Sequence, residues 1–353
     1  MWLRRPDFAH GAFVRRADGG TDVAATPGAE RPYELFAWPA MQILRHLPAR
    51  GAVPTALTVG NFDGVHRGHR AMLERLASAA HERNLASCLM TFEPHPREFF
   101  APDRAPARLT SLREKLELLA GMDVGRVHVQ RFDYDFAQMS AEDFIGSVLV
   151  EGLQARWILV GDDFRFGARR QGDIELLRQT GMRLGFEVVQ MDSVLVDGVR
   201  VSSTVVRELL AAGKLDDAAH LLGRPYSVSG RVVRGQRLGS RLGFPTANLQ
   251  LKHNRPALLG IFVVEVTGLS AQPLPGVASL GVRPTVVEAG LPLLEVHLLD
   301  FARDIYGEHL QVRFLSKLRD EEKYNDIETL RRQIARDVEA ARAFFAARGR
   351  SAH

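Results

Sequence analysis

Cysteine is almost absent from this chain, which has one, Cys88, among 353 residues. A single cysteine excludes an internal disulfide, and its place inside an apolar run predicts a small buried side chain. No apolar run approaches the roughly 20 residues of a membrane-spanning helix, and the first residues lack the apolar segment of a secretory signal. These absences predict a cytoplasmic protein without a membrane partner.

The chain also lacks a strong excess of charge of one sign. It has 46 Lys and Arg against 42 Asp and Glu, a formal net charge of +4. The basic residues are scattered rather than clustered, so nucleic-acid binding is not required, and phosphorylated small molecules account for the excess. The sequence leaves the oligomeric state open.

A length of 353 residues favours two domains. Residues 1–40 are rich in Gly, Ala and Pro without an apolar period, and we expect a disordered extension there. Regular patterning starts near Ile43, immediately after Met41, which suggests the hypothesis that the native chain begins at that methionine. Arg224-Pro225 marks a change of pattern. We therefore expect one domain over 41–222 and a second over 223–350.

Strand-like and helix-like segments alternate through the first domain. This alternation predicts a Rossmann-like, doubly wound α/β fold with a parallel sheet. Ser140-Ala141-Glu142-Asp143 has the pattern of a capping box and opens a predicted helix over 141–149. The predicted strands are 55–59, 86–92, 126–132, 155–160 and 186–191.

A glycine-rich turn joins the first predicted strand to a helix and contains His66 and His69. At a helix N-terminus, unpaired backbone N–H groups and the helix dipole favour an anion, and Gly60 and its neighbours let a phosphate approach. Two imidazoles three residues apart can donate N–H groups to one phosphoryl group. By itself the pair also fits half of a metal site. Its place after a strand favours phosphate binding, because open α/β sheets bind ligands there.

Two later segments of this domain fit the same site. Residues 161–167, including Asp163, follow a predicted strand and should emerge beside the histidines. Ser202, Ser203 and Thr204 lie at a predicted helix start with Arg200 and Arg207 nearby, which indicates a second anion-binding site. For either serine alone, a simple helix cap is the competing interpretation.

The second domain alternates apolar and polar residues by twos, as in a small antiparallel barrel or sandwich. Its predicted strands are 226–233, 260–266, 293–299 and 310–315. A final helix from about Asp326 carries one apolar stripe, which we interpret as core packing. The stripe consists of Ile327, Leu330, Ile334, Val338, Ala341 and Phe345.

The chemistry of the second domain is predicted at residues 235–248, where repeated glycines lead to Thr246 and Asn248. Side chains two residues apart in extended chain share a face. A hydroxyl and an amide oxygen can therefore both bind Mg²⁺ beside the phosphates of ATP.

Several of these motifs resemble a known family. The turn at 60–69 resembles the His-x-Gly-His signature of nucleotidylyl transferases, which move AMP from ATP to a phosphate acceptor. Residues 91–96, 161–167 and 202–207 resemble the FMN adenylyltransferase module of bacterial FAD synthetases. The resemblance implies catalytic roles for His66 and His69. It also implies nucleotide contacts at Gly60, Phe62, His66, His69, Asp163, Arg200, Ser203, Thr204 and Arg207, and flavin contacts at Phe62, Asp63, Pro94 and Pro96.

In the second domain, Gly243-Phe244-Pro245-Thr246-Ala247-Asn248 resembles the signature of riboflavin kinases. The resemblance implies that Glu295 is the base for the ribityl 5′-hydroxyl and that Arg319 contacts the flavin. It further implies nucleotide binding by Gly239, Gly243, Pro245, Thr246 and Asn248, the last two with Mg²⁺.

Together the two halves resemble the bifunctional riboflavin kinase and FMN adenylyltransferase of bacteria. The implied substrates are riboflavin, FMN and ATP. Two alternatives are a flavin-binding sensor that keeps the folds without turnover, and an enzyme that adenylylates another phosphate, such as phosphopantetheine. The presence of His66, His69, Thr246, Asn248 and Glu295 weighs against the sensor, and the riboflavin-kinase signature weighs against the second.

Overall fold

The computed structural model describes residues 41–47, 53–235, 238–251, 255–282 and 292–350. The expected disordered extension over 1–40 lies outside these ranges. The proposed start at Met41 and the two domain boundaries stay predictions.

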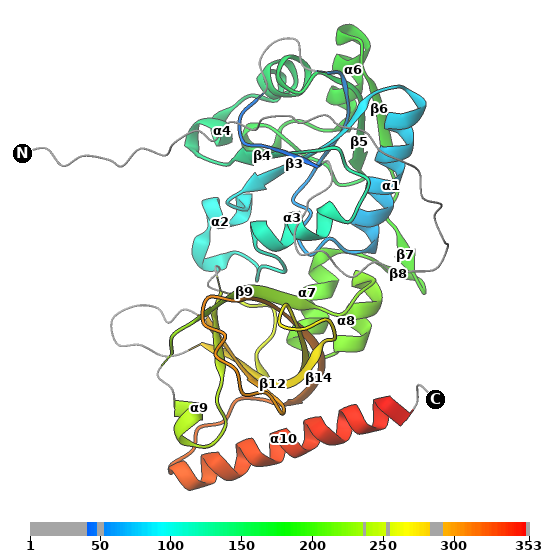
Figure 1. Cartoon of the computed structure of the whole chain (residues 1–353). Helices are drawn as coiled ribbons and strands as arrows, with labels where there is room; N and C mark the ends of the chain where they lie inside the picture. The colour runs from blue at the N-terminus through cyan, green and yellow to red at the C-terminus, as the bar shows by residue number, and fades with distance from the viewer. Residues whose placement is uncertain (1–40, 48–52, 236–237, 252–254, 283–291, 351–353) are drawn as a thin grey trace, which may run out of the picture. The chain divides into compact units, whose positions relative to one another are not determined.

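The first half contains a six-stranded parallel sheet in the order β1-β4-β3-β2-β5-β6 (Figure 1). From β2 the chain proceeds to β3 and β4 on one side and later to β5 and β6 on the other, so the strand order reverses at β2. Ligands bind outside the carboxyl ends of strands at such a point. The strands are β1 (Gln42–Leu44), β2 (Thr55–Val59), β3 (Ala86–Glu93), β4 (Arg126–Arg131), β5 (Ala155–Gly161) and β6 (Glu187–Met191).

The five predicted strands of this sheet are confirmed, and one strand was missed. Strand β1 has only three residues and pairs with β4 alone. A three-residue edge strand is too short to show a period of two, so the sequence pattern gave no signal for it.

Helices cover both faces of the sheet, as a doubly wound fold requires. Alternate residues of a strand face opposite sides, so Leu57 and Ile158 lie in one apolar cluster and Ala56 and Trp157 in the other. Cys88 is fully buried in the first cluster, as predicted. The helices are α1 (Arg67–Glu82), α2 (Pro96–Phe100), η1 (Pro102–Arg104), α3 (Leu112–Ala120), α4 (Tyr134–Gln138), α5 (Ala141–Asp143), η2 (Phe144–Gly152), η3 (Ala168–Arg170) and α6 (Ile174–Leu184).

The helix predicted over 141–149 begins as expected but winds differently. Ser140 caps α5, because its Oγ accepts a hydrogen bond of 3.0 Å from the Asp143 N–H. The second half of the predicted capping box is wrong, because the Asp143 carboxylate accepts from the Ser140 hydroxyl at 2.8 Å and not from the Ser140 backbone N–H. The chain then continues as the π-helix η2. Apolar spacing does not distinguish the two windings, so the sequence predicted the position of this helix and not its pitch.

A short hairpin and two helices follow the sheet. They are β7 (Leu195–Val196), β8 (Val199–Arg200), α7 (Ser203–Ala211) and α8 (Leu215–Leu222). Val206 and Leu210 of α7 and Leu221 of α8 belong to the same apolar cluster as the interior of the second half. These two helices therefore share a core with the domain that follows them.

The second half is a closed antiparallel barrel in the order β10-β13-β12-β11-β14-β9, so the barrel expectation is confirmed over the sandwich. Strand β10 was missed because it has only four residues. Strand β12 was missed because its Pro275, Gly276 and Gly281 indicate turns. The elements are β9 (Ser227–Val233), α9 (Leu238–Arg241), β10 (Ala247–Gln250), β11 (Gly260–Thr267), β12 (Leu274–Val282), β13 (Pro292–Leu298) and β14 (His309–Arg319).

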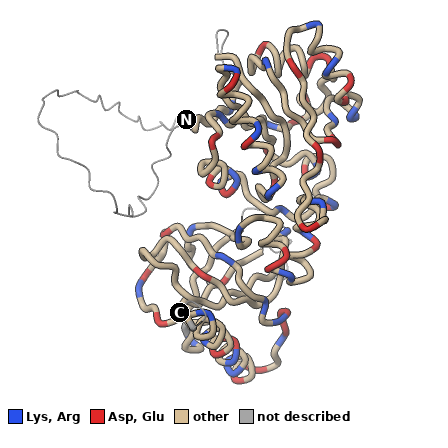
Figure 2. The backbone as a smooth tube through the Cα atoms, turned by 90° about the vertical axis from the view of Figure 1, so that its right-hand side faces the viewer, with Lys and Arg blue, Asp and Glu red and all other residues tan. Residues whose placement is uncertain are grey.

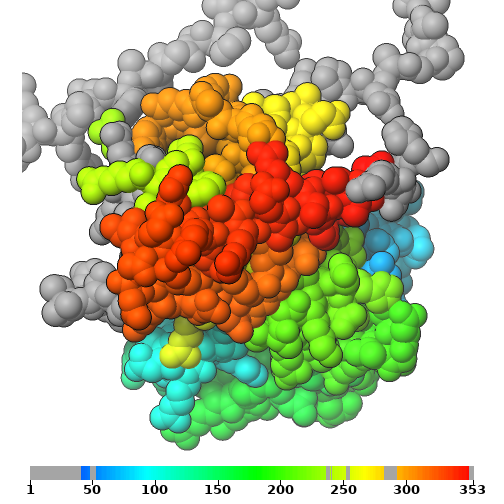
Figure 3. Space-filling view, turned by 90° about the horizontal axis from the view of Figure 1, so that it is seen from below, coloured from blue at the N-terminus to red at the C-terminus, as the bar shows by residue number. Residues whose placement is uncertain are grey.

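The C-terminal helix α10 (Ile327–Arg350) lies across the outside of the barrel (Figures 1 and 3). Its Val338 and Ala341 pack against Ile261 and Val263 of β11, which confirms core packing for most of the stripe. Ile327 and Leu330 lie outside this apolar cluster, and the prediction for Ile327 is wrong, because it is 64 % exposed. Packing against the barrel begins only at Ile334, two turns later.

Figure 2 shows basic and acidic residues interspersed along the described backbone. In the same residues, no helix is both long enough and apolar enough to cross a membrane.

Candidate active sites

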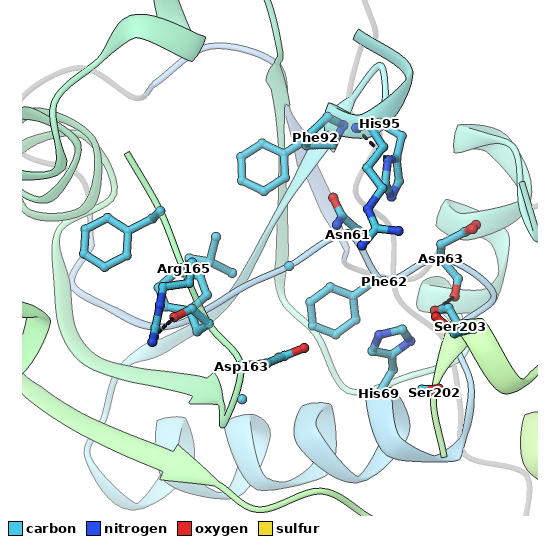
Figure 4. Close-up of a pocket in the computed structure, with 18 of the residues that line it drawn as sticks. Asn61, Phe62, Asp63, His69, Phe92, His95, Asp163, Arg165, Ser202 and Ser203 are labelled. Carbon is cyan, nitrogen blue, oxygen red and sulfur yellow. Dashed lines mark hydrogen bonds between the residues drawn. The ribbon is translucent and has the colours of Figure 1, made fainter. Parts of the chain in front are cut away.

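A cavity of about 990 Å³ lies at the carboxyl ends of β2 and β5, where the strand order reverses. Figure 4 shows Phe62, His69 and Asp163 converging on this space from different segments. Pro94, predicted to contact flavin, does not line the cavity. The predicted residues that do line it are Gly60, Phe62, Asp63, His66, His69, Pro96, Asp163, Arg200, Ser203, Thr204 and Arg207.

The two histidines form one rigid unit at the start of α1. His66 is the N-cap, and its Nδ1 accepts a hydrogen bond of 3.3 Å from the His69 backbone N–H. The two rings are stacked with centroids 3.6 Å apart. Gly68 permits this stack, because a Cβ there would lie 3.2 Å from the His66 ring. Since Nδ1 of His66 is an acceptor, the proton of its neutral ring is on Nε2.

Burial keeps both imidazoles uncharged. It lowers the pKa of His66 to about 4, although the Asp63 carboxylate acts in the opposite direction. Burial, then the adjacent His66 ring, holds the pKa of His69 well below its ordinary value. His69 Nδ1 is buried and has no hydrogen-bond partner among the described residues. At neutral pH the site therefore presents neutral N–H donors.

Phe62 joins this unit through an unusual backbone conformation. Its φ of 48° is left-handed, which is rare for an aromatic residue. The Phe62 ring lies 4.7 Å from the His69 ring, centroid to centroid. Gly60 leaves room for that ring, since a Cβ there would lie 3.0 Å from it. The turn thus packs a phenyl ring against the imidazole.

Asp63 is 3 % exposed, and its carboxylate is bound on several sides. It accepts hydrogen bonds of 3.0 Å from the backbone N–H and from the hydroxyl of Thr110, and one from the Leu109 N–H. It also forms an ion pair with Arg207. Burial alone raises the pKa of this carboxyl, but Arg207 and the Leu109 N–H outweigh burial and lower it. Asp63 therefore stays charged and fixes the Arg207 guanidinium at the cavity wall.

The start of α7 brings hydroxyl groups to the same wall. Ser202 is the N-cap of α7, since its Oγ accepts from the Val205 N–H at 3.3 Å. The simple cap interpretation is therefore confirmed for Ser202. Ser203 differs, because its Oγ donates to the Asp63 carbonyl at 2.9 Å and links α7 to the histidine turn.

The charge of the cavity wall favours an anion. Arg200 donates to Asp162 at 3.0 Å, and Asp162 also accepts from Ser193. Asp63 and Asp162 are therefore each paired with an arginine of the wall. The arginines outnumber the four lining aspartates; they are Arg97, Arg165, Arg169, Arg170, Arg200 and Arg207.

Sequence reasoning missed one side of this cavity, which is aromatic. Phe92 lies 5.9 Å from Phe132 and from Phe136, and Phe164 stacks on Phe166 at 5.3 Å. The predicted motifs contain Phe92, Phe164 and Phe166, but only contact between distant segments shows that these rings form one wall. His95 also lines the cavity, and it lies in the loop from Pro94 to Pro96 that the family resemblance places beside the flavin.

A second site lies on the barrel. Strand register places Asn248 of β10 opposite Glu295 of β13, and Glu295 opposite Ser279 of β12. Residues opposite each other in antiparallel strands share a face. The three side chains therefore form one polar row across neighbouring strands, and Thr246 immediately precedes β10.

The amide of Asn248 is 5 % exposed, and its Oδ1 has no hydrogen-bond partner in the part of the chain that the structure describes. Gly235 lies so near that a Cβ there would be 2.6 Å from the amide, and one at Gly239 would be 3.2 Å from the Thr246 side chain. Pro245 is held by its carbonyl, which accepts from His297 at 2.8 Å. The glycine-rich segment thus approaches both predicted metal ligands closely.

Arg319, predicted to contact flavin, has partners within the protein. Its guanidinium donates to the Asp337 carboxylate at 3.0 and 2.8 Å and to the Asp320 carbonyl at 3.0 Å. This ion pair joins β14 to α10. The flavin contact of Arg319 stays a prediction.

Comparisons with known protein families match the two halves separately. The family model described as FAD synthetase matches residues 50–205, and the model described as riboflavin kinase matches residues 222–345.

Named relatives cover most of the chain. A bifunctional riboflavin kinase/FMN adenylyltransferase of Escherichia coli is 50 % identical over 86 % of this chain and 95 % of its own length. The protein of the same name from Pseudomonas fluorescens is 48 % identical over 87 % of this chain and 98 % of its own length. A solved structure titled as a macrolide-efflux protein of Streptococcus pneumoniae is similar with a TM-score of 0.71 and 28 % identity, covering 86 % of this chain and 99 % of that one.

Proposed function

The chain belongs to the family of bifunctional riboflavin kinases/FMN adenylyltransferases, and from that membership we propose that it makes FAD in two steps. In the first, the barrel transfers the γ-phosphoryl group of ATP to riboflavin, which yields FMN and ADP. In the second, the phosphate of FMN attacks the α-phosphorus of another ATP at the cavity of the α/β half, and pyrophosphate leaves. Each step has its own ATP site.

For adenylyl transfer, the His66 and His69 pair donates N–H groups to the phosphates of ATP. Both rings are neutral, so each carries one N–H donor, and their stack fixes the ring orientations before ATP binds. Arg207, held by Asp63, adds positive charge where negative charge accumulates on the leaving pyrophosphate. Positioning and electrostatic stabilisation carry most of such a reaction.

For riboflavin phosphorylation, Glu295 accepts the proton of the ribityl hydroxyl as that oxygen attacks phosphorus. The residues beside it fit a magnesium ion, because the buried Asn248 Oδ1 is a neutral oxygen acceptor without a partner among the described residues. Asn248 and Thr246 would hold the ion. When bound, Mg²⁺ supplies neutralising charge to the transferring phosphoryl group.

The observation that carries this proposal is the gathering of all the predicted nucleotide-binding residues of the first half, from three separate motifs, around one cavity. The aromatic wall opposite suits a flat ring system. The aromatic wall matches the ring system of a flavin, and the wall with the histidines and arginines matches the phosphates of a nucleoside triphosphate.

The proposal is tested by incubating the purified chain with riboflavin, ATP and Mg²⁺ and separating the flavins by chromatography over time. We expect FMN first and then FAD, with one pyrophosphate released per FAD. When FMN replaces riboflavin, FAD should form without a lag, and EDTA should stop both products. A chain that binds flavin but forms neither product would be a sensor and would refute the proposal.

A further inference from the structure

Lys115 is a buried cation that neither reaction described above uses. It lies in α3, whose first turn is closed by a capping box between Ser111 and Glu114, and its side chain is on the buried face of that helix. It is 4 % exposed, although lysine is among the residues least often buried. It does not line the cavity. Burying an ammonium group costs free energy unless hydrogen bonds and nearby charges compensate. The groups that Lys115 contacts therefore show which part of the structure it stabilises.

The Lys115 ammonium donates a hydrogen bond of 3.1 Å to Thr91 Oγ1 in β3. An ammonium group only donates, so the Thr91 oxygen must accept, and its own hydrogen is left for another acceptor. That acceptor is the backbone carbonyl of Asn61, at 3.2 Å. The two hydrogen bonds therefore run in one direction, from Lys115 through Thr91 to Asn61, and we call this pair of bonds the relay. Thr91 is fully buried.

This series of hydrogen bonds ends at Asn61, which lines the cavity. Asn61 immediately precedes Phe62, the residue with the left-handed φ of 48°. A bulky residue holds such a conformation only where its surroundings impose it. Gly60, on the other side of Asn61, donates its N–H to the Met90 carbonyl at 3.0 Å. The turn is thus held to β3 at two successive residues, and its conformation places the Phe62 ring against His69.

The charge of Lys115 is compatible with this role. Burial lowers its pKa to about 8, while the carboxylates of Asp63 and Glu93 oppose that shift. Glu98 also stabilises the cation, and Arg108 repels it. The side chain therefore carries its charge at neutral pH and its three donor hydrogens.

We propose that Lys115 is a positioning residue for adenylyl transfer: through Thr91 it holds the Asn61 carbonyl, and so keeps the Phe62 ring packed on His69. This role rests on the proposed function, because it acts on the cavity assigned to FMN and ATP. Lys115 does not touch either substrate. It fixes the turn that contains Phe62, whose ring packs against the His69 imidazole.

The test compares Thr91→Val with Thr91→Ser in the full chain. Serine keeps the hydroxyl and the relay, whereas valine has nearly the same shape as threonine and removes the relay. With FMN and ATP supplied, we expect kcat to fall at least about tenfold in Thr91→Val, with KM changing much less, and to stay within about threefold of wild type in Thr91→Ser. Riboflavin phosphorylation in the same samples reports on the barrel, which contains neither Thr91 nor Lys115, and should be unchanged.

Lys115→Met completes a double-mutant cycle with Thr91→Val. If the two residues act through one relay, the double variant should be no slower than the slower single variant. If the fold losses in kcat of the two single variants multiply in the double variant, the residues act independently and the proposal is wrong. Equal activity of Thr91→Val and Thr91→Ser would also overturn it, and so would a parallel loss of kinase activity. If Lys115→Met fails to fold, the pair at Thr91 decides alone. Absence of FAD from wild-type protein would instead refute the proposed function.

Discussion

At the scale of single residues, the adenylyl site depends on groups whose charge is set by burial and by fixed partners. His66 and His69 lose their positive charge because the stacked rings are buried. Asp63 keeps its negative charge in spite of burial, because Arg207 and two backbone N–H groups bind it. Before substrate binds, the site therefore holds the neutral N–H donors of His66 and His69 beside the Arg207 guanidinium, which Asp63 keeps in place.

The state of His66 can be measured directly by NMR. A lowered pKa means that the proton is lost at lower pH, so the ring is neutral throughout the physiological range. We expect its ring-proton resonance, assigned with His66→Gln, to stay constant above about pH 5.5 and to move only toward pH 4. In the urea-unfolded protein the same histidine should titrate near its ordinary value of about 6.5. Titration near 6.5 in the folded protein would contradict the account.

Asp63 is predicted to act through Arg207 rather than on substrate. Asp63→Asn removes the charge that holds the Arg207 guanidinium, so adenylyl transfer should fall on the order of 10²-fold in kcat/KM. Asp162→Asn is the matched control, because its pair with Arg200 is more exposed, and its loss should be much smaller. Steady-state kinetics with supplied FMN measures both. Equal effects of the two variants would count against this role of Asp63.

At the scale of elements, the ion pairs that join α10 to the barrel include a buried one and an exposed one of similar geometry. Arg319 and Asp337 join β14 to α10, with side chains 18 % and 7 % exposed. Arg342 of α10 binds Asp300 with two hydrogen bonds of 2.7 Å, with side chains 42 % and 73 % exposed. The same helix therefore offers a comparison between a buried and a solvated pair.

Breaking the buried pair should destabilise the barrel more. Asp337→Ala leaves Arg319 without its carboxylate partner, and we expect the free energy of unfolding to fall by about 2 kcal/mol. Asp300→Ala removes an exposed pair that water replaces, so its effect should be far smaller. Urea unfolding followed by circular dichroism measures both variants. A larger effect for Asp300→Ala would show that burial does not govern the strength of these pairs.

Some of the strands could be predicted from the sequence and others could not. Buried parallel strands such as β2 are short runs of apolar and β-branched residues, and the fold class follows from their alternation with helices. Strands β1 and β12 were missed, because one is too short for a period and the other contains Pro275 and glycines. The exposed Ile327 was missed because a stripe on a helix does not reveal where the barrel surface ends.

At the scale of the whole molecule, the candidate residues that line the cavity of the α/β half could be picked from the sequence because each lies in a short motif with its own chemistry. The cavity gathers those motifs from β2, β5 and α7. What the motifs could not give are contacts that arise only in three dimensions. The relay from Lys115 joins segments with no shared pattern, and the pairing of Arg319 with Asp337 depends on how α10 packs.

The central claim is that two separate active sites on this chain perform successive reactions. It is tested most directly by assaying His69→Ala and Glu295→Gln, each with riboflavin and with FMN as the supplied flavin. His69→Ala should still form FMN from riboflavin but no FAD from either flavin, and Glu295→Gln should form FAD from FMN but nothing from riboflavin. If either variant loses both reactions while remaining folded, or if neither loses its own, the division into two sites is wrong.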